Sequence, residues 1–185
     1  MTLRRFASTA VAVLTCSALS SFAWADSAYM KVQGDKSGNI SGGVVLKGHE
    51  NTIEVIAVDH SIVTPTDAAT GMATGKRQHK PFVITKLLDR SSPLLHQAQM
   101  TNENLKEVDL DFVSSARTSA SSSSYYRIIL KNARITSVRL VMPNNKQADT
   151  STLGTYEEVS FSYQSITWTW IDGGITSTDD ANVAR

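Results

Sequence analysis

The sequence contains one cysteine, Cys16, and four prolines among 185 residues. A single cysteine excludes a disulfide within the chain and a zinc site built from several cysteines. Neither charge is in excess, because 18 lysine and arginine residues face 17 aspartate and glutamate residues, for a formal net charge of +1. Without a general positive field, the composition argues against a nucleic-acid partner and favours a protein partner.

The proportions of hydrophobic and charged residues are those of one folded domain. They amount to 41% and 19%, and a chain of this length can bury a sizeable core. No internal repeat of fixed period is visible, which argues against solenoid and propeller folds.

The first 25 residues have the pattern of a secretory signal peptide. Arg4 and Arg5 give a positive start, residues 6–14 form an apolar run, and Ala23 and Ala25 are small residues at the spacing that signal peptidase requires. The apolar run is too short to span a bilayer stably, so we expect no stable membrane insertion. The pattern predicts cleavage after Ala25 and transit through the periplasm.

Two other interpretations of this segment stay open. In the first, the start codon is assigned too far upstream, and the protein is cytoplasmic and begins downstream of Met1. Alternatively, Cys16 is a lipid-attachment site, although Thr15 before it fits a lipoprotein signal poorly.

From residue 26 onward, apolar and polar residues alternate with a period of two, which predicts β-strands with one buried face. Val108, Leu110 and Phe112, for example, alternate with acidic residues. Similar runs occupy residues 158–163 and 166–170. The apolar parity switches between these two runs, which predicts a bulge or tight bend at residues 164–165.

Other segments complete a mainly β pattern. Residues 53–58 and 125–130 are apolar on both faces, as in strands covered on both sides or strands with one face in an interface. Ser91-Ser92-Pro93 predicts the start of one short α-helix. Further strands are expected at residues 81–85 and 134–142, and loops at residues 34–43, 64–75, 114–124 and 144–154. These features predict a β-barrel or sandwich with one helix, followed by a polar, mobile tail at residues 173–185.

No motif of catalysis or metal binding stands out. His49, His60, His79 and His96 lack the spacing of metal ligands, so we interpret them as surface or interface residues and expect no metal and no cofactor. The chain has no G-x-S-x-G elbow and no phosphate-binding loop. An enzyme on a small barrel is therefore the weakest hypothesis, and we name no catalytic residue.

A basic cluster is the main candidate for a contact site. It contains Lys76, Arg77, His79 and Lys80, beside a strand that begins with proline. We expect these residues to contact a neighbouring subunit, since such a cluster is costly to bury unless it is paired. Asp89 and Arg90 are further candidates for subunit contact, with Asp89, Asp109 and Asp111 as available acids. The alternative is a solvated loop.

Several segments together resemble one family, in the family's order from residue 26 to residue 170. They are AYMKVQG at residues 28–34, GKRQHKPFVITK at 75–86, LDRSSPLL at 88–95, YYRI at 125–128, EEVSFSY at 157–163 and ITW at 166–168. The family is that of the Hcp (hemolysin-coregulated) proteins, which build the inner tube of bacterial type VI secretion systems.

The resemblance implies a two-sheet β-barrel with one short α-helix over residues 26–172. It also implies a homohexameric ring that stacks into a tube and is released from the cell. The implied partners are further copies of the chain, type VI effector proteins, and tube-tip or sheath components. A heterologous contact that closes by rotation would give such a ring. Proteins of this family assemble in the cytoplasm without a cleavable signal peptide, so the alternative is an Hcp-like ring or carrier protein exported separately and acting outside the tube.

Overall fold

The computed structural model describes residues 26–114, 123–147, 149–150 and 154–181. The strands in these residues are β1 (Asp26–Gly34), β2 (Asn39–Ile40), β3 (Ile53–Val55), β4 (Ala57–Asp59), β5 (Ile62–Val63), β6 (Gln78–His79), β7 (Phe82–Leu87), β8 (Leu105–Ser114), β9 (Ser123–Val141), β10 (Tyr156–Ser162), β11 (Ser165–Trp170) and β12 (Ile175–Asp180). The one helix among them is α1 (Ser92–Met100). The expected cleavage site at Ala23 and Ala25, and Cys16, lie outside the described residues.

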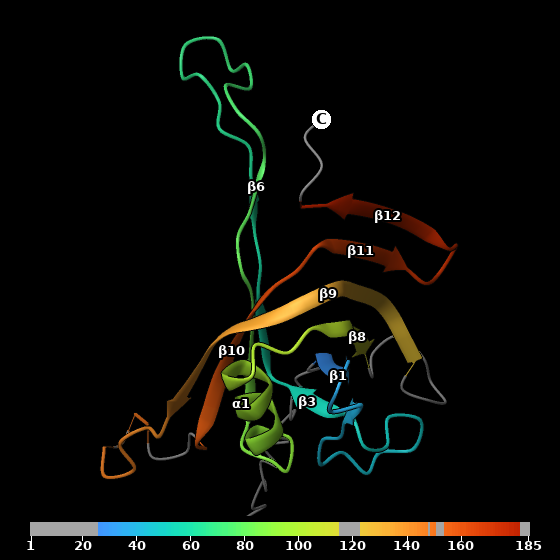
Figure 1. Cartoon of the computed structure of the whole chain (residues 1–185), viewed down its shortest axis with the longest axis vertical. Coiled ribbons are helices and arrows are strands. Elements are labelled where there is room, and N and C mark those ends of the chain that lie inside the picture. Colours follow the sequence, from blue (N-terminus) through green and yellow to red (C-terminus); the bar gives the residue numbers. More distant parts are fainter. Residues whose placement is uncertain (1–25, 115–122, 148, 151–153, 182–185) are drawn as a thin grey trace, which may run out of the picture.

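The strands form two main antiparallel sheets that share β9 (Figure 1). The first 11 residues of β9 pair with β8 and β11, and its later residues pair with β10. Between these two parts, Asn132 has a φ of 49°, and asparagine tolerates this left-handed conformation better than most residues. Two separate strands were predicted here, at residues 125–130 and 134–142, but the chain forms one bent strand.

The prediction of a mainly β fold with two sheets and one helix is confirmed, but the described strands do not close into a barrel. On the side opposite β9, residues 53–59 pass from one sheet to the other. There β3 pairs with β1 and β4 pairs with β7. The ladder is interrupted at Ile56 between the two strands, so the hydrogen-bonded path has two ends.

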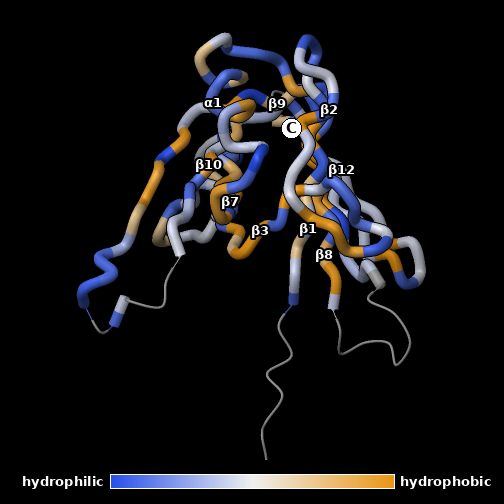
Figure 2. The backbone as a smooth tube through the Cα atoms, turned by 90° about the horizontal axis from the view of Figure 1, so that it is seen from below, coloured by the Kyte–Doolittle hydropathy of each residue, from blue (hydrophilic) through white to orange (hydrophobic). Residues whose placement is uncertain are grey.

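The core lies between the sheets. The predicted alternation is confirmed along β8 from Glu107 to Leu110, but beyond it Asp111 is buried and Phe112 only partly so. Val108 and Leu110 are fully buried, and they lie opposite Leu130 and Ile128 of β9. The strands of the body carry hydrophobic residues, whereas the outlying loops are mostly hydrophilic (Figure 2). The helix covers the core with Leu95 and Ala98 and packs on β9.

The start of the helix was predicted correctly, with Pro93 in its first turn. The Ser91 side chain does not cap the helix, because its hydroxyl donates to Asp89 Oδ1 at 2.5 Å. The helix ends at Met100, and Asn102 then turns the chain with a φ of 50°.

Residues 60–80 form a long arm that extends beyond the sheets (Figure 1). Near its base β5 pairs with β6, and near its tip Thr66 and Ala73 form a bridge. Asp67 orders the tip, since it accepts hydrogen bonds from the backbone N–H groups of Ala69 and Thr70. The loop predicted at residues 64–75 is therefore the tip of a narrow hairpin.

The expectation of a mobile tail is wrong for residues 175–180, which form strand β12. This strand pairs with β11 along its whole length. We call the two strands the C-terminal hairpin. Its turn uses Gly173 and Gly174, whose φ angles of 88° and 65° are strained for residues with a side chain. The first sheet thus continues beyond residue 172.

Candidate assembly surface

The basic residues of the arm fall into two groups. Lys76 and Lys80 are exposed to solvent. Arg77 and His79 instead reach Asp179 of β12: Arg77 forms an ion pair with this carboxylate, and His79 Nε2 lies 3.0 Å from Asp179 Oδ2. Burial acts to raise the pKa of Asp179, but the hydrogen bond and charge of Arg77 outweigh it and hold the pKa below its ordinary value. Part of the cluster therefore fixes the arm to its own chain.

A second contact lies at the base of the arm. The hydroxyl of Tyr163, between β10 and β11, is 2.6 Å from His60 Nε2 and 2.9 Å from His79 Nδ1. Burial and the charge of Asp179 raise the pKa of Tyr163, so the phenol stays protonated. Of the four histidines predicted to lie at a surface or interface, His60 and His79 meet here within the chain. The prediction is also wrong for His49, which is buried, whereas the His96 side chain is 43% exposed.

Asp89 and Arg90 hold the loop at residues 41–52. Asp89 Oδ2 accepts a hydrogen bond of 3.0 Å from the backbone N–H of Gly43. Arg90 donates to the Gly42 carbonyl and, at 2.6 Å, to Asn51 Oδ1. Both residues therefore act within the chain to shape this loop.

The acids expected to meet the basic cluster across a subunit boundary also have partners within the chain. Asp89 pairs with Lys86 at 2.9 Å. Arg127 of β9 donates to Asp111 at 2.7 and 3.1 Å and lies 3.5 Å from Asp109. Burial raises the pKa of Asp109; the charge of Arg127 opposes this shift, and Asp111 adds to it.

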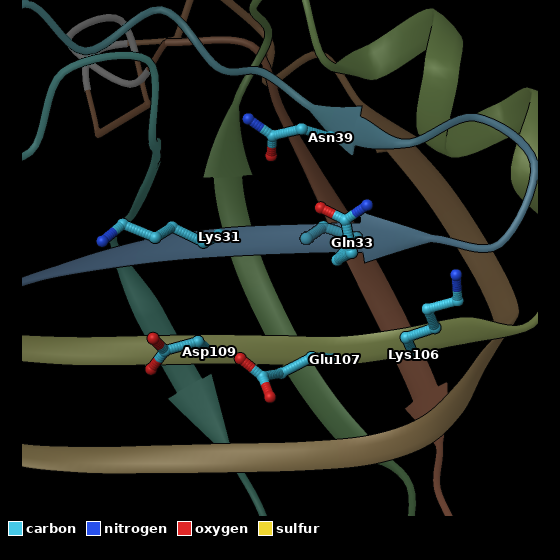
Figure 3. A pocket seen from close by; sticks show the side chains of 7 residues that line it. Lys31, Gln33, Asn39, Lys106, Glu107 and Asp109 are labelled. Carbon is cyan, nitrogen blue, oxygen red and sulfur yellow. The ribbon is translucent and has the colours of Figure 1, made fainter.

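A polar pocket of about 450 Å³ lies on the outer face of the first sheet (Figure 3). Lys31 and Asp109 lie opposite each other on β1 and β8, and Gln33 and Glu107 form the next such pair. The remaining lining residues are Val32, Asn39 and Lys106. Amine, amide and carboxylate groups alternate here, so the pocket can bind the polar groups of a polypeptide.

Large apolar side chains lie exposed around the fold. In the loop at residues 41–52, Val45 is 91% exposed, and Ile56 between β3 and β4 is 53% exposed. The others are Leu46, Val63, Met72, Leu87, Leu88, Leu94, Met100, Leu140, Met142, Ile171 and Ile175. The segment at residues 53–58 was predicted to be apolar on both faces. One of these faces, at Ile56, is exposed to solvent in the single chain, as in a strand that uses one face in an interface.

Within the described ranges, no group of three or more histidine, cysteine, aspartate or glutamate residues is placed to hold a metal ion. In the same ranges, the single helix is too short and polar to cross a membrane.

Sequence reasoning missed Asp179 and Tyr163 as contacts of the arm. Asp179 belongs to a strand that is polar except for Ile175, which is 70% exposed, so β12 shows no apolar alternation. Tyr163 looked like the last apolar residue of a strand. Neither signal links these residues to the arm. The pairs of His60 with Tyr163 and of Arg77 with Asp179 each join residues about 100 positions apart.

Comparison with known proteins places this fold in a family. Residues 29–170 match the family described as "Type VI secretion system effector, Hcp". The "Major exported protein" of Pseudomonas aeruginosa is 35% identical over 164 residues, which cover 83% of this chain and 94% of that protein.

Solved structures agree with this assignment. The Hcp1 protein of an E. coli pathovar is 32% identical, with a TM-score of 0.73 over 83% of this chain and 97% of that one. The secreted protein Hcp3 of Pseudomonas aeruginosa is 31% identical, with a TM-score of 0.68 over 86% of this chain and 100% of that one. The chain therefore belongs to the Hcp family of type VI secretion, whose members are secreted structural proteins and not enzymes.

Proposed function

We propose that this chain is a subunit of the type VI inner tube, forming hexameric rings that stack and that carry or bind effector proteins. The observation that supports this best is the projecting arm, together with apolar side chains that a solitary domain would leave in water. A ring needs a heterologous contact, in which one surface of a subunit meets a different surface of the next. The arm and the face around Ile56 are two such different surfaces.

The proposed role of the candidate contact residues follows from their bonds within the chain. Lys76 and Lys80 are exposed on the arm and carry the direct contact to a neighbouring subunit or ring. Arg77 and His79 set the direction of the arm through Asp179. Asp89 and Arg90 shape the loop that presents Val45 and Leu46.

The polar pocket beside β1 and β8 is the surface that we assign to effector binding. Its paired charges and amides suit a folded protein surface, and binding there would depend on ionic strength. Tube-tip and sheath components are the further partners that this role requires.

Native mass spectrometry and electron microscopy of the purified protein test the assembly. We expect a closed hexamer and, at high concentration, stacked rings. A species that remains monomeric at high concentration would contradict the tube role.

The sequence of residues 1–25 favours a second candidate function, that of a ring or carrier protein exported separately and acting outside the tube. N-terminal sequencing of the secreted protein distinguishes the two. A chain that begins at Asp26 supports separate export and periplasmic transit, and a chain that retains the upstream residues supports assembly in the cytoplasm. Secretion from a strain without the contractile sheath provides the matching test, since only the tube role predicts its loss.

A further inference from the structure

The base of the arm and the C-terminal hairpin meet in a row of four polar side chains. His60 Nε2, the Tyr163 hydroxyl and His79 Nδ1 follow one another at 2.6 and 2.9 Å, and His79 Nε2 continues to Asp179 at 3.0 Å. His60 follows β4 and His79 lies in β6, whereas Asp179 lies in β12. The row therefore connects both strands of the arm with the hairpin.

The number of protons in this row is restricted by its chemistry. His79 Nε2 faces a carboxylate, so this nitrogen carries a hydrogen. If His79 is neutral, its Nδ1 accepts the hydrogen bond from Tyr163, and the Tyr163 oxygen then accepts one from His60 Nε2–H. Every contact is satisfied with both imidazoles neutral. One added proton can also be accommodated on His79, because its Nδ1–H then donates to the Tyr163 oxygen while the Tyr163 hydroxyl turns to donate to His60 Nε2.

A second added proton does not fit. Both imidazoles would then direct N–H groups at the Tyr163 oxygen, and the tyrosine hydrogen would lose its acceptor. Two cations would also face each other across one oxygen atom, in a half-buried site where their repulsion is poorly screened.

We propose that Tyr163, His60 and His79 form a pH-sensitive latch, which holds the base of the arm against the C-terminal hairpin at neutral pH and releases it in mild acid. Release breaks the contact of His60 with Tyr163. The ion pair of Arg77 with Asp179 persists, so the arm stays tethered at this second point while its base becomes free to move.

The charged groups around the latch support release below neutral pH. Burial lowers the pKa of His60, the positive charge of His79 lowers it further, and Asp59 beside it opposes the shift. His60 therefore takes up its proton at a lower pH when latched than when free, where its pKa is about 6.5. The latch contributes its full stability above that pH and loses it as the pH falls through the lower pKa of the latched state.

Solvent has access to the latch. A cavity of about 140 Å³ lies against it and is lined by His79, Lys80, Pro81, Ser162, Tyr163 and Ala181. Protons can therefore exchange without unfolding of the sheets. The backbone N–H of Ala181 donates to the Gln164 carbonyl beside this cavity at 2.8 Å, and the N–H of Lys80 donates to Ser61 at 3.0 Å. These two amides report on the hairpin side and the arm side of the latch.

Amide hydrogen exchange of the full chain, corrected for intrinsic rates, tests the proposal. We expect protection of the Lys80 and Ala181 amides to fall about tenfold between about pH 7.5 and pH 5, as a hydrogen bond is lost. The His60→Gln variant keeps an N–H donor but cannot take up a proton, so its protection should not change with pH. His96→Gln, at a half-exposed histidine on α1, is the control and should behave like the unmodified protein.

Each other result overturns the latch. Constant protection of the unmodified protein, or an unaltered loss in His60→Gln, excludes control by this histidine. In the Tyr163→Phe variant, the Lys80 and Ala181 amides should have low protection at both pH values. Full protection of these amides at neutral pH would show that the hydroxyl does not hold the arm against the hairpin. Should a variant fail to fold, histidine NMR titration of the unmodified protein decides. Coupled titration of His60 and His79 supports the latch, and two independent ordinary titrations refute it. All readouts lie within one chain, so failure of the proposed tube role leaves this test unaffected.

Discussion

The Lys86 ammonium donates a hydrogen bond of 2.9 Å to Glu157 Oε1, and both side chains are completely buried between β7 and β10. Ser92 Oγ also donates to Glu157 Oε1, at 2.8 Å, and Lys86 reaches the Leu87 carbonyl and Asp89. Through Ser92, this ion pair ties the start of α1 to the second sheet. A buried pair with further hydrogen bonds is costly to break from one side, because the remaining charge loses its partner.

The first prediction concerns this pair. Glu157→Ala should lower the free energy of unfolding by about 3–5 kcal/mol, since it leaves the Lys86 charge buried without its main partner. The matched control is its neighbour Glu158, which forms a 2.9 Å pair with Arg139 at the surface. Glu158→Ala should cost at most about 1 kcal/mol. Urea unfolding measures both, and equal losses would contradict the importance of burial.

A second prediction uses two adjacent glycines. A Cβ at Gly42 would lie 2.2 Å from the Thr52 carbonyl oxygen and 2.6 Å from Ile53 Cα, which are backbone atoms that cannot move aside. Gly42→Ala should therefore cost about 1–3 kcal/mol. A Cβ at Gly43 would meet Asp89 Cβ at an ordinary 3.6 Å, so Gly43→Ala should change stability by less than about 0.5 kcal/mol. Thermal unfolding of the two variants distinguishes them, and equal midpoints would be the contrary result.

A third prediction concerns the acid stability that Glu103 provides. Its Oε1 accepts hydrogen bonds of 2.7 Å from the backbone N–H groups of Lys36 and Ser37, and one of 3.0 Å from the Ser37 hydroxyl. Burial acts to raise the pKa of Glu103, but these donors outweigh it and hold the pKa below its ordinary value. The unfolded chain therefore takes up this proton first as the pH falls.

The stabilisation by Glu103 is fully present above the unfolded pKa of about 4.3 and is lost as the pH falls through the lower folded value. Glu103→Gln should lower the free energy of unfolding by about 1–2 kcal/mol at neutral pH. Below about pH 5, where the stabilisation by Glu103 begins to be lost, the stability of the variant should depend less on pH. Glu107→Gln, at an exposed position on the following strand β8, is the control. Denaturant unfolding at a series of pH values gives the slopes, and parallel slopes for the Glu103 variant and the unmodified protein would refute the assignment.

A fourth prediction tests the arm as an assembly element. The double change Lys76→Glu and Lys80→Glu should dissociate rings while circular dichroism shows a folded subunit, because both lysines are exposed to solvent. High salt should weaken the rings of the unmodified protein in the same direction. Lys146→Glu, an exposed lysine in another loop, should leave rings intact. Size-exclusion chromatography with light scattering measures the effect, and intact rings in the double variant at both low and high salt would rule out this contact.

Local patterns predicted much of the body of the fold. The alternation along residues 107–110 gave the buried side of β8, and the change of parity near residues 164–165 marked the break between β10 and β11. Ser91-Ser92-Pro93 marked the start of α1. Each of these signals depends on neighbouring residues and on one buried face, which the sequence shows directly.

The remaining features depend on contacts between distant segments. Two predicted strands proved to be one, because Asn132 bends β9 without ending it. β12 is stabilised by pairing with β11 and lacks an apolar face, so its composition resembled that of a tail. Arg77 pairs with Asp179 only because the fold brings the arm beside the C-terminal hairpin. Charge alone cannot select such a partner among 17 acidic residues.

The shared strand β9 also determines when the protein can fold during synthesis. Its partner β8 (Leu105–Ser114) precedes it in the chain, but β10 and β11 follow it and end at Trp170. A nascent chain can therefore pair β1, β8 and the first part of β9, yet the second sheet is incomplete until β10 ends at Ser162 and the first until β12 ends at Asp180. Pairings between segments so far apart form slowly, typically in milliseconds to seconds. Until then the chain exposes the apolar residues of both unfinished sheets, and during this interval it can still be recognised by chaperones or by an export apparatus that accepts only unfolded chains.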